Sequence, residues 1–549
     1  MPTWWRNWMP VLRRNRAPCF IFTFLEFFMN GAKALIDTLV ANDVTVCFAN
    51  PGTSEMHLVQ ALDAVPAMRG VLCLFEGVCT GAADGYGRMR GTPATTLLHL
   101  GAGLANGVAN LHNARRANAP IINLIGDHAV HHVAFDAPLT SDIEGIAAPV
   151  SAWVRTARTA GGLAGDAMDA LLATLDARPN PAGAIATLII PADCAWGDSH
   201  GPDGRSVSAV RAPEPVSSGA VRSAAASLGS QSLLLLDGTA LSDAGLQAAA
   251  RIAAKTGAAV FSTTFPARVD GGPGRLPIKK MPYFPEHVQK TLARFDAMVL
   301  AGAQAPVSFF AYPETPSSLV PADMPVVRLS HRHEDSVAAL QALADELDAP
   351  MVTVPGHDPV RPDIPSGALS TGAISTMIAA TAPQDSIVAV DSGGGGAAYV
   401  PMQQAVRHSW LNLTGGAIGQ GGPVAVGAAV ACPERSVYAL LGDGGAGYTN
   451  QFLWTAAREK LDITVIVYSN RSYNILDVEY RRLGVNDVGD RAAALFALDD
   501  PPIDWTAMAT AFGVPAIRAD DCAQFLAGLE TARETPGPFL IEATVTARD

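Results

Sequence analysis

Short apolar runs alternate with helical stretches along most of the chain, and this pattern restricts the fold more than any other feature. Residues 185–191 and 233–236 carry no charged side chain and lack the polar–apolar alternation of a strand with one face in water. Strands of this kind are buried on both faces, as in parallel sheets that helices cover on both sides. The sequence therefore predicts an α/β protein built from doubly wound parallel sheets.

The apolar runs fall into three groups of similar length. The 549 residues agree with this number, because domains average roughly 150 residues. We expect an N-terminal extension at residues 1–28, a first domain at 29–195, a middle domain at 196–355 and a third domain at 356–549. Ligands of such sheets bind beyond the carboxyl ends of the strands, so the segments that follow the strands are the candidate sites.

Charge and cysteine content exclude several classes of function. The formal net charge is −13, from 51 acidic and 38 basic residues, so no nucleic-acid partner is expected. The seven cysteines are odd in number and form no CxxC pair, which is typical of reduced thiols in a cytoplasmic protein. Only 16% of the residues are charged, which favours an oligomer whose subunits cover part of the surface.

Residues 1–28 differ in composition from the rest. Arginines precede an apolar run at 19–28, but no small-x-small cleavage site follows, and the run is too short to span a bilayer. We interpret this segment as an upstream extension, with Met29 as the functional start; an interfacial membrane anchor is the alternative. No later stretch is apolar enough to suggest a membrane partner.

The most specific motif is Gly-Asp-Gly-Gly at residues 442–445, which ends an apolar strand. The next strand ends at Asn470, 27 residues after Asp443, so the two side chains should lie at one edge of the sheet. Carboxylate, amide and carbonyl oxygens suit Mg²⁺ that is held partly by phosphate, and glycines let backbone N–H groups approach a diphosphate. An ordinary strand-to-helix turn is the alternative for the motif taken alone.

This arrangement resembles the thiamine diphosphate motif of the benzoylformate decarboxylase and acetolactate synthase superfamily, with Ser469-Asn470 in place of the usual Asn-Asn. The resemblance implies that Asp443 and Asn470 bind Mg²⁺ through their side chains and Ser472 through its backbone carbonyl. It also implies a set of residues around the diphosphate: Gly393, Gly394, Gly442, Gly444, Gly445, Tyr448 and Tyr473.

A second segment, residues 415–419, resembles the family's Gly-x-hydrophobe-Gly turn. Ile418 would support the bent cofactor, and the carbonyl of Gly416 would accept a hydrogen bond from its exocyclic amine. An isoleucine between glycines is otherwise most often a core residue.

The first domain carries a candidate catalytic carboxylate. Glu76 follows an apolar run expected to be a strand at residues 71–75, and Asp84-Gly85-Tyr86 follow it. This pattern resembles the pyrimidine-binding domain of the same superfamily, in which the glutamate hydrogen-bonds the aminopyrimidine ring and promotes removal of the C2 proton. A structural ion pair or a helix cap is the alternative.

The loop at residues 49–55 resembles the substrate loop of benzoylformate decarboxylase, so Thr53 and Ser54 are expected to bind the substrate carboxylate. His99 resembles that family's active-site histidine, and a hydrogen-bonded strand-end histidine is the alternative. His131 and His132 resemble the histidine pair of pyruvate and indolepyruvate decarboxylases, although histidines in a surface loop are often solvated. The family's middle-domain histidine aligns with Leu276.

The resemblance implies thiamine diphosphate- and Mg²⁺-dependent decarboxylation of a 2-oxo acid through an enamine, with carboligation to an acyloin as a further outcome. An acetolactate synthase-type carboligase is one alternative, although the Phe-Gln-Glu segment of those enzymes is absent at residues 136–143. A catalytically silent cofactor-binding homologue is another, and the intact Glu76, Asp443 and Asn470 argue against it. The resemblance further implies a homodimer or homotetramer with active sites at the subunit interfaces, and the middle domain has no evident flavin signature.

Overall fold

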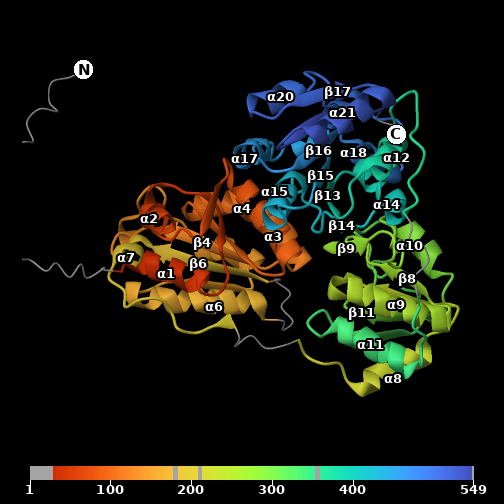
Figure 1. Cartoon of the computed structure of the whole chain (residues 1–549), viewed down its shortest axis with the longest axis horizontal. Coiled ribbons are helices and arrows are strands. Elements are labelled where there is room, and N and C mark those ends of the chain that lie inside the picture. The colour runs from red at the N-terminus through yellow and green to blue at the C-terminus, as the bar shows by residue number, and fades with distance from the viewer. Residues whose placement is uncertain (1–28, 177–183, 208–212, 353–358, 547–549) are drawn as a thin grey trace, which may run out of the picture.

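The computed structural model describes residues 29–176, 184–207, 213–352 and 359–546, so the extension expected at 1–28 lies outside the described residues. The chain forms three predominantly parallel sheets, each flanked by helices, with the first domain in red to orange, the middle domain in green and the third in blue (Figure 1). This confirms the α/β class predicted from the apolar runs.

The first sheet is entirely parallel, in the order β2-β1-β3-β4-β6-β5. Its strands are β1 (Val46–Asn50), β2 (Arg69–Leu72), β3 (Ala94–Leu98), β4 (Ile121–Asp127), β5 (Trp153–Thr156) and β6 (Ile185–Pro191). The helices are α1 (Gly31–Val40), α2 (Met56–Ala64), α3 (Glu76–Arg90), α4 (Leu100–Ala117), α5 (Ile143–Ala147), α6 (Leu163–Leu175) and α7 (Ala192–Trp196). Adjacent residues Cys47 and Phe48 belong to different buried clusters, so both faces of this sheet are covered.

The expected strand at residues 71–75 is shifted in the structure. β2 ends at Leu72, and Glu76 is the first residue of α3. The position suits a carboxylate, because the first N–H groups of a helix are free and the helix dipole favours negative charge there. Glu76 therefore lies at a helix N-terminus rather than at a strand end.

The middle sheet is also parallel, in the order β10-β8-β7-β11-β12. Its strands are β7 (Ser232–Leu236), β8 (Ala259–Ser262), β10 (Lys279–Lys280), β11 (Ala297–Ala301) and β12 (Val326–Ser330). The helices are α8 (Ser218–Ser227), α9 (Asp243–Thr256), α10 (Pro285–Leu292) and α11 (Ser336–Glu346).

The third sheet has the order β17-β18-β16-β15-β13-β14-β9. Its strands are β9 (Arg268–Gly271), β13 (Ser386–Asp391), β14 (His408–Leu411), β15 (Val437–Gly442), β16 (Ile463–Ser469), β17 (Ala516–Ala519) and β18 (Phe539–Thr544). The helices are α12 (Thr371–Thr381), α13 (Gly393–Gly396), α14 (Tyr399–Ala405), α15 (Gly421–Ala431), α16 (Asp443–Ala446), α17 (Phe452–Glu459), α18 (Asn474–Arg482), α19 (Asp490–Phe496), α20 (Trp505–Ala511) and α21 (Cys522–Glu534).

One strand departs from the purely parallel pattern expected. β9 comes from the middle part of the chain, yet it pairs antiparallel with β14 at the edge of the third sheet. Arg268 at its start bonds Asp270 and the backbone carbonyls of Arg88 and Met89 in the first domain. β9 therefore joins all three parts of the chain.

The first and third domains dock through two closely packed helices, α3 and α15, seen side by side in Figure 1. A Cβ added to Gly427 would lie 1.8 Å from the carbonyl oxygen of Ala82, so only glycine fits. The buried ion pair between Asp84 and Arg88 strengthens this contact, because Gln420 donates to Asp84 at 2.6 Å. Asp84 of the Glu76 motif thus has a structural role.

All six described cysteines are free thiols, as their spacing predicted. In the described ranges, every helix is too short or too polar to cross a bilayer.

Candidate functional site

The loop that follows β1 brings a carboxylate, a hydroxyl and an imidazole together. The side chain of Glu55 is fully buried. Its Oε2 accepts a hydrogen bond from the amide of Gly52 at 2.7 Å and lies 2.8 Å from Nδ1 of His99, and its Oε1 accepts one from the Ser54 hydroxyl. Because an ionised carboxylate can only accept, Nδ1 of His99 carries the hydrogen, and Nε2 remains for other partners.

The local backbone is adapted to this pair. β1 and β3 are the neighbouring strands at which the order of the first sheet reverses, and open α/β sheets bind ligands at such points. Glu55 follows β1, and His99 directly follows β3. A Cβ on Gly52 would lie 2.2 Å from Nδ1 of His99, and a Cβ on Gly126 would lie 1.9 Å from Oε1 of Glu55. These two glycines leave the space that the pair occupies.

Sequence reasoning identified His99 but missed Glu55. An acidic residue in the first turn of a helix usually indicates only a favourable interaction with the helix dipole. The nearby Asn50-Pro51-Gly52 turn was a usable signal, because it follows an apolar strand and returns the chain toward the sheet edge.

Thr53 and Ser54, the two expected substrate-binding residues, lie in different environments. The hydroxyl of Ser54 is engaged by Glu55 and lies 3.2 Å from Nδ1 of His99. Thr53 is exposed. Of the two, Thr53 has the side chain that is available to a ligand.

Glu76 is buried close to His99. Its Oε2 accepts a hydrogen bond from the amide of Asn106 at 2.9 Å. A Cβ built on Gly103 would lie 3.1 Å from Oε1 of Glu76 and 3.4 Å from Cβ of His99, so both residues border the first turn of α4. Asn106 was not predicted from the sequence. The Gly-rich segment around it, residues 101–107, has only a superficial likeness to a dinucleotide-binding motif.

His131 and His132 lie beyond β4, as expected, but in a separate group. Nδ1 of His131 lies 3.7 Å from a carboxylate oxygen of Asp193, and the side chain is largely exposed. The ring of His132 contacts those of His128 and Phe135. In the described part of the chain, neither histidine hydrogen-bonds to Glu55 or Glu76.

The third domain brings the predicted metal ligands together. Asp443 is buried, and its carboxylate accepts hydrogen bonds from the amides of Gly444 and Arg471 at 2.8 and 2.6 Å. The bond from Arg471 joins the end of β15 to the end of β16, where Oδ1 of Asn470 accepts from the amide of Ser472. Burial raises the pKa of Asp443, and its amide partners oppose that rise. A nearby cation would favour the ionised carboxylate.

Asp391, at the end of β13, shapes the turn that carries Ile418. Its Oδ2 accepts hydrogen bonds from the amides of Gly419, Gln420 and Gly421 at 2.6, 2.8 and 3.2 Å. Burial raises the pKa of Asp391 despite these three bonds. Because β13 and β15 are neighbours where the strand order reverses, the Ile418 turn and Asp443 lie at the same edge of the third sheet.

The other predicted cofactor residues surround the same edge. A Cβ on Gly444 would lie 2.2 Å from the Tyr473 ring, and one on Gly419 would lie 2.6 Å from Cβ of Tyr448. On the short helix α13, Gly394 faces Thr371 and Tyr468, whereas a Cβ on Gly393 would meet no atom within 4 Å. Gly442 and Gly445 both adjoin Asp391.

The two groups belong to different domains of the chain. The loop before α15 docks on α4, where Asn113 donates to the carbonyl of Ala417 at 2.7 Å and His112 to that of Gly415 at 3.1 Å. Within residues 29–546 as described, no hydrogen bond joins Glu76 or His99 to Asp443 or Asn470. One chain therefore presents a carboxylate–imidazole half and a metal-ligand half.

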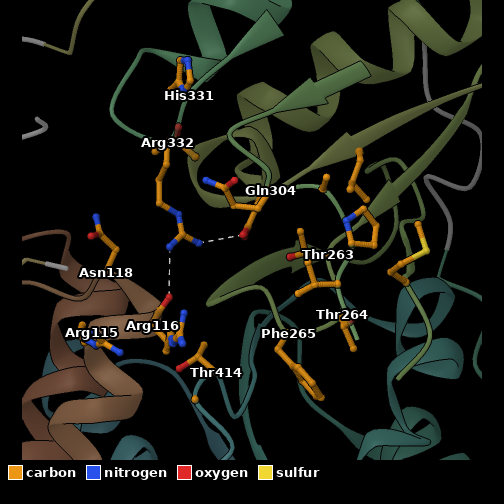
Figure 2. Close-up of a pocket in the computed structure, with 18 of the residues that line it drawn as sticks. Arg115, Arg116, Asn118, Thr263, Thr264, Phe265, Gln304, His331, Arg332 and Thr414 are labelled. Carbon is orange, nitrogen blue, oxygen red and sulfur yellow. Dashed lines mark hydrogen bonds and ion pairs between the residues drawn. The ribbon is translucent and has the colours of Figure 1, made fainter. Parts of the chain in front are cut away.

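The middle domain holds a separate cavity of about 1050 Å³ at the carboxyl edge of its sheet. Figure 2 shows Arg115 and Arg116 from α4 on one side and Thr263, Thr264 and Phe265 after β8 on the other. Arg332 donates to the carbonyl of Arg116 and to Asp237, which follows β7. The cavity extends to Thr414 and Gly415, next to the turn that carries Ile418.

The donor set fits thiamine diphosphate with a divalent metal. In the described ranges, no three His, Cys, Asp or Glu side chains form a metal cluster, so a metal here would rest on Asp443, the Asn470 amide oxygen, a backbone carbonyl and phosphate. Oδ1 of Asp391 is buried without a hydrogen-bond partner beside this edge, which leaves an acceptor for an added group.

Comparison with known proteins agrees with both halves of the site. Residues 29–146 match the thiamine pyrophosphate enzyme N-terminal TPP binding domain, and residues 391–543 match the C-terminal TPP binding domain. The first range contains Glu76 and His99, and the second contains Asp443 and Asn470.

Relatives of similar length match nearly the whole chain. The chain is 47% identical to a provisionally named acetolactate synthase large subunit, IlvX, from Mycobacterium tuberculosis, over 94% of this chain and 99% of that protein. It is 27% identical to benzoylformate decarboxylase from Pseudomonas aeruginosa, over 93% and 98%. The solved structure of 4-hydroxybenzoylformate decarboxylase from Rhodococcus jostii RHA1 shares the fold, with a TM-score of 0.80 at 22% identity over 94% and 99% of the two chains. The chain therefore belongs to the thiamine pyrophosphate-dependent enzymes, in the branch that contains decarboxylases and acetolactate synthase-like proteins.

Proposed function

We propose that the protein is a Mg²⁺-dependent decarboxylase of 2-oxo acids that releases an aldehyde. The observation that carries this proposal is the position of His99, which a buried carboxylate orients beside Glu76. Aldehyde release requires a proton at the former keto carbon after carbon dioxide leaves, and a positioned imidazole is a suited donor near neutral pH.

Bound thiamine diphosphate supplies the carbon nucleophile and the electron sink for loss of carbon dioxide. Asp443, Asn470 and the carbonyl of Ser472 would hold the metal, which would neutralise the charge of the diphosphate. The carbonyl of Gly416 would accept a hydrogen bond from the aminopyrimidine, and Ile418 would pack against the cofactor.

The first domain supplies the proton-transfer groups. Glu76 would hydrogen-bond the aminopyrimidine and serve in its proton exchange, and Asn106 donates to the Glu76 carboxylate and so fixes its position. The hydroxyl of Thr53 donates to the substrate carboxylate. In its imidazolium form, His99 would give the Nε2 proton to the carbon that loses carbon dioxide and would return to the neutral Nδ1–H form that Glu55 holds. His131 and His132 remain candidates for proton exchange with solvent.

The complete site would be formed by two chains, since no hydrogen bond joins these groups in the described part of one chain. A dimer, or a tetramer built as a dimer of dimers, would place the Glu76 half of one subunit against the Asp443 half of the other. The pyrimidine-binding, middle and diphosphate-binding domains then span 29–195, 196–355 and 356–549. Strand β9 belongs to the middle domain by sequence but completes the sheet of the diphosphate-binding domain.

Acetolactate synthase-type carboligation is the second candidate, and the name of the 47% identical relative favours it. Both reactions release carbon dioxide, so the organic product distinguishes them. The purified protein with thiamine diphosphate and Mg²⁺ should convert a 2-oxo acid to its aldehyde and carbon dioxide, measured by NMR and gas release. An acyloin or acetohydroxy acid as the main product would favour carboligation.

Cofactor binding tests the same proposal without turnover. Thiamine diphosphate with Mg²⁺ should bind the wild-type protein in a calorimeter, and Asp443→Ala should abolish binding because the metal bridges protein and diphosphate. Asp323→Ala, a change at an exposed carboxylate, is the matched control. Absence of binding to the wild type would refute the proposal.

A further inference from the structure

The turn that carries Gly416 and Ile418 has little structure of its own. Residues 412–420 connect β14 to α15 and lie outside any helix or strand. Gly416 and Gly419 both adopt left-handed conformations, with φ of +81° and +92°, and Gly416 is exposed. Glycine restricts the backbone less than any other residue. Contacts from outside the turn must therefore hold it in one conformation.

The C-terminal half of the turn is held by its own domain. The carboxylate of Asp391 accepts hydrogen bonds from the amides of residues 419–421, and the hydroxyl of Thr449 donates to the carbonyl of Gly419 at 2.7 Å. These contacts begin at Gly419, directly after Ile418. The half that contains Gly416 needs separate contacts.

The first domain holds that half through Asn113 of α4. The side chain of Asn113 is fully buried. Its Nδ2 donates to the carbonyl of Ala417 at 2.7 Å, and its Oδ1 accepts from the amide of Ala417 at 3.2 Å. One side chain thus binds both backbone groups of the residue between Gly416 and Ile418. This pairing needs an amide, which offers a donor and an acceptor side by side.

Further contacts from α4 reach the start of the turn. The hydroxyl of Thr414 donates to the backbone carbonyl of Asn113 at 2.7 Å, and Nε2 of His112 donates to the carbonyl of Gly415 at 3.1 Å. A Cβ on Gly415 would lie 2.4 Å from Oδ1 of Asn113, so this close approach requires glycine. Helix α4 therefore binds the chain on both sides of Gly416.

The middle domain contacts the same turn in a different way. A Cβ on Gly416 would lie 2.8 Å from Cζ of Phe309, so the tip of an aromatic ring lies against this glycine. An apolar contact of this kind is not directional, whereas a hydrogen bond orients the groups that it joins. The orientation of the peptide groups around Gly416 is therefore determined by Asn113 rather than by Phe309.

Helix α4 also binds the segment that contains Glu76. Asn106, Asn110 and Asn113 are spaced by four and three residues and therefore lie on one face of the helix. Asn106 donates to Oε2 of Glu76 at 2.9 Å, and Asn110 donates to the carbonyl of Gly77 at 2.7 Å. One row of asparagines thus holds both the start of α3 and the cofactor turn.

We propose that Asn113 is a positioning residue for the ring portion of thiamine diphosphate. By pairing with Ala417, it keeps the carbonyl of Gly416 and the side chain of Ile418 in the orientation that the cofactor requires. This inference rests on the proposed function, since it assumes that the cofactor rings bind at this turn. Because Asn113 acts through the turn, its loss should weaken binding of the rings and spare binding of the diphosphate.

Ligand binding to the cofactor-free protein tests this role. Asn113→Asp keeps the size of the side chain and the acceptor for the Ala417 amide, but it places a carboxylate oxygen against the Ala417 carbonyl. In calorimetric titrations, thiamine diphosphate with Mg²⁺ should bind this variant about 5–50-fold more weakly than the wild type, because a buried carbonyl has lost its donor. Inorganic pyrophosphate with Mg²⁺ should bind both proteins equally, because Asp443 and Asn470 are unchanged.

Asn42→Asp is the matched control. Asn42 is a buried asparagine next to the end of α1, and its side chain also binds two backbone groups. It donates to the carbonyl of Thr38 and accepts from the amide of Val207, both at 2.9 Å. Asn42→Asp should lower the urea midpoint, as Asn113→Asp does, but leave binding of thiamine diphosphate unchanged.

Three results would overturn the role of Asn113: wild-type binding of thiamine diphosphate in Asn113→Asp, an equal loss of binding in Asn42→Asp, or an equal loss of pyrophosphate binding in Asn113→Asp. If Asn113→Asp does not fold, Asn113→Ala, which introduces no charge, provides the same comparison. Absence of thiamine diphosphate binding to the wild type would refute the proposed function and this inference together. Cofactor binding that depends on Asn113, without release of carbon dioxide from 2-oxo acids, would refute only the decarboxylase.

Discussion

Oε2 of Glu55 lies 2.8 Å from Nδ1 of His99, and the two residues follow the adjacent strands at which the first sheet reverses its order. A fully buried carboxylate thereby determines the tautomer of an imidazole that is itself partly accessible. The same carboxylate also accepts from Gly52 and Ser54, so it is rigidly held.

We expect Glu55 and His99 to act as one unit. His99→Ala should slow the protonation step by about 10²–10⁴-fold, as for loss of a general acid. Glu55→Gln should slow the same step by a smaller factor, because the amide keeps the size but loses the charge. The double variant should be no slower than His99→Ala in single-turnover measurements of aldehyde formation. If the rate losses of the two single variants multiplied in the double variant, the two residues would be acting independently.

Glu76→Gln should separate cofactor binding from cofactor activation. The amide preserves shape, so binding of thiamine diphosphate should weaken by less than about tenfold, or roughly 1.4 kcal/mol. Hydrogen–deuterium exchange at C2, followed by quenched NMR, should slow severely because the carboxylate is lost. His99→Ala should exchange like the wild type. If Glu76→Gln exchanged the C2 hydrogen as fast as the wild type, the proposal that the first domain binds the aminopyrimidine would lose its basis.

Mixing two inactive variants tests whether the site spans two chains. Glu76→Gln and Asp443→Ala should each be inactive alone. In a hybrid dimer, one site would combine the intact Glu76 of one chain with the intact Asp443 of the other. Unfolding and refolding the variants together should therefore restore a minor part of the wild-type activity. No recovery, with hybrids verified by mass spectrometry, would indicate a site formed within one chain.

Gly427→Ala should destabilise the contact between α3 and α15. A Cβ there would lie 1.8 Å from the Ala82 carbonyl oxygen, which forces backbone to move. We expect a loss of about 1–3 kcal/mol, seen as a lower urea midpoint. Gly219→Ala in α8, where a Cβ meets only the Ser217 hydroxyl at 3.8 Å, should be neutral or stabilising. Equal midpoints for the two variants would contradict this packing argument.

His408 should make stability depend on pH in the acidic range. It is fully buried on β14, and burial lowers its pKa from 6.5 to about 4. As the pH falls, the imidazole of His408 takes up a proton in the unfolded chain before it does so in the folded protein. The contribution of neutral His408 to the free energy of unfolding is therefore complete above pH 6.5 and is lost toward pH 4, by up to about 3 kcal/mol. His408→Gln should reduce the change in urea midpoint between pH 7.5 and 5, whereas exposed His200→Gln should not. An unchanged pH dependence in His408→Gln would refute this assignment.

Most of the architecture could be predicted from local pattern. The apolar strand runs indicated parallel sheets, and the Gly-Asp-Gly and Asn470 spacing indicated a metal and diphosphate edge. The end of the strand predicted at residues 71–75 was wrong. Val71 to Phe75 are all apolar, so the sequence gives no sign of where pairing stops, whereas in the structure the last backbone hydrogen bond to β1 is donated by Cys73 to Ala49. The antiparallel β9 was also missed, because four residues carry too little periodicity to reveal a partner 140 residues away.

The sequence by itself determined the fold class and the chemistry of each half-site, because strand burial and the short spacing of ligand residues are local properties. Only the tertiary structure decided which buried acid orients His99, which glycines make room for it, and that Phe309 reaches the Gly416 turn. Those relationships join residues that are far apart in the chain, and they depend on strand order and loop direction. Glu55 and His99 meet because β1 and β3 are neighbours in the sheet, although α2, β2 and α3 lie between these two strands in the sequence.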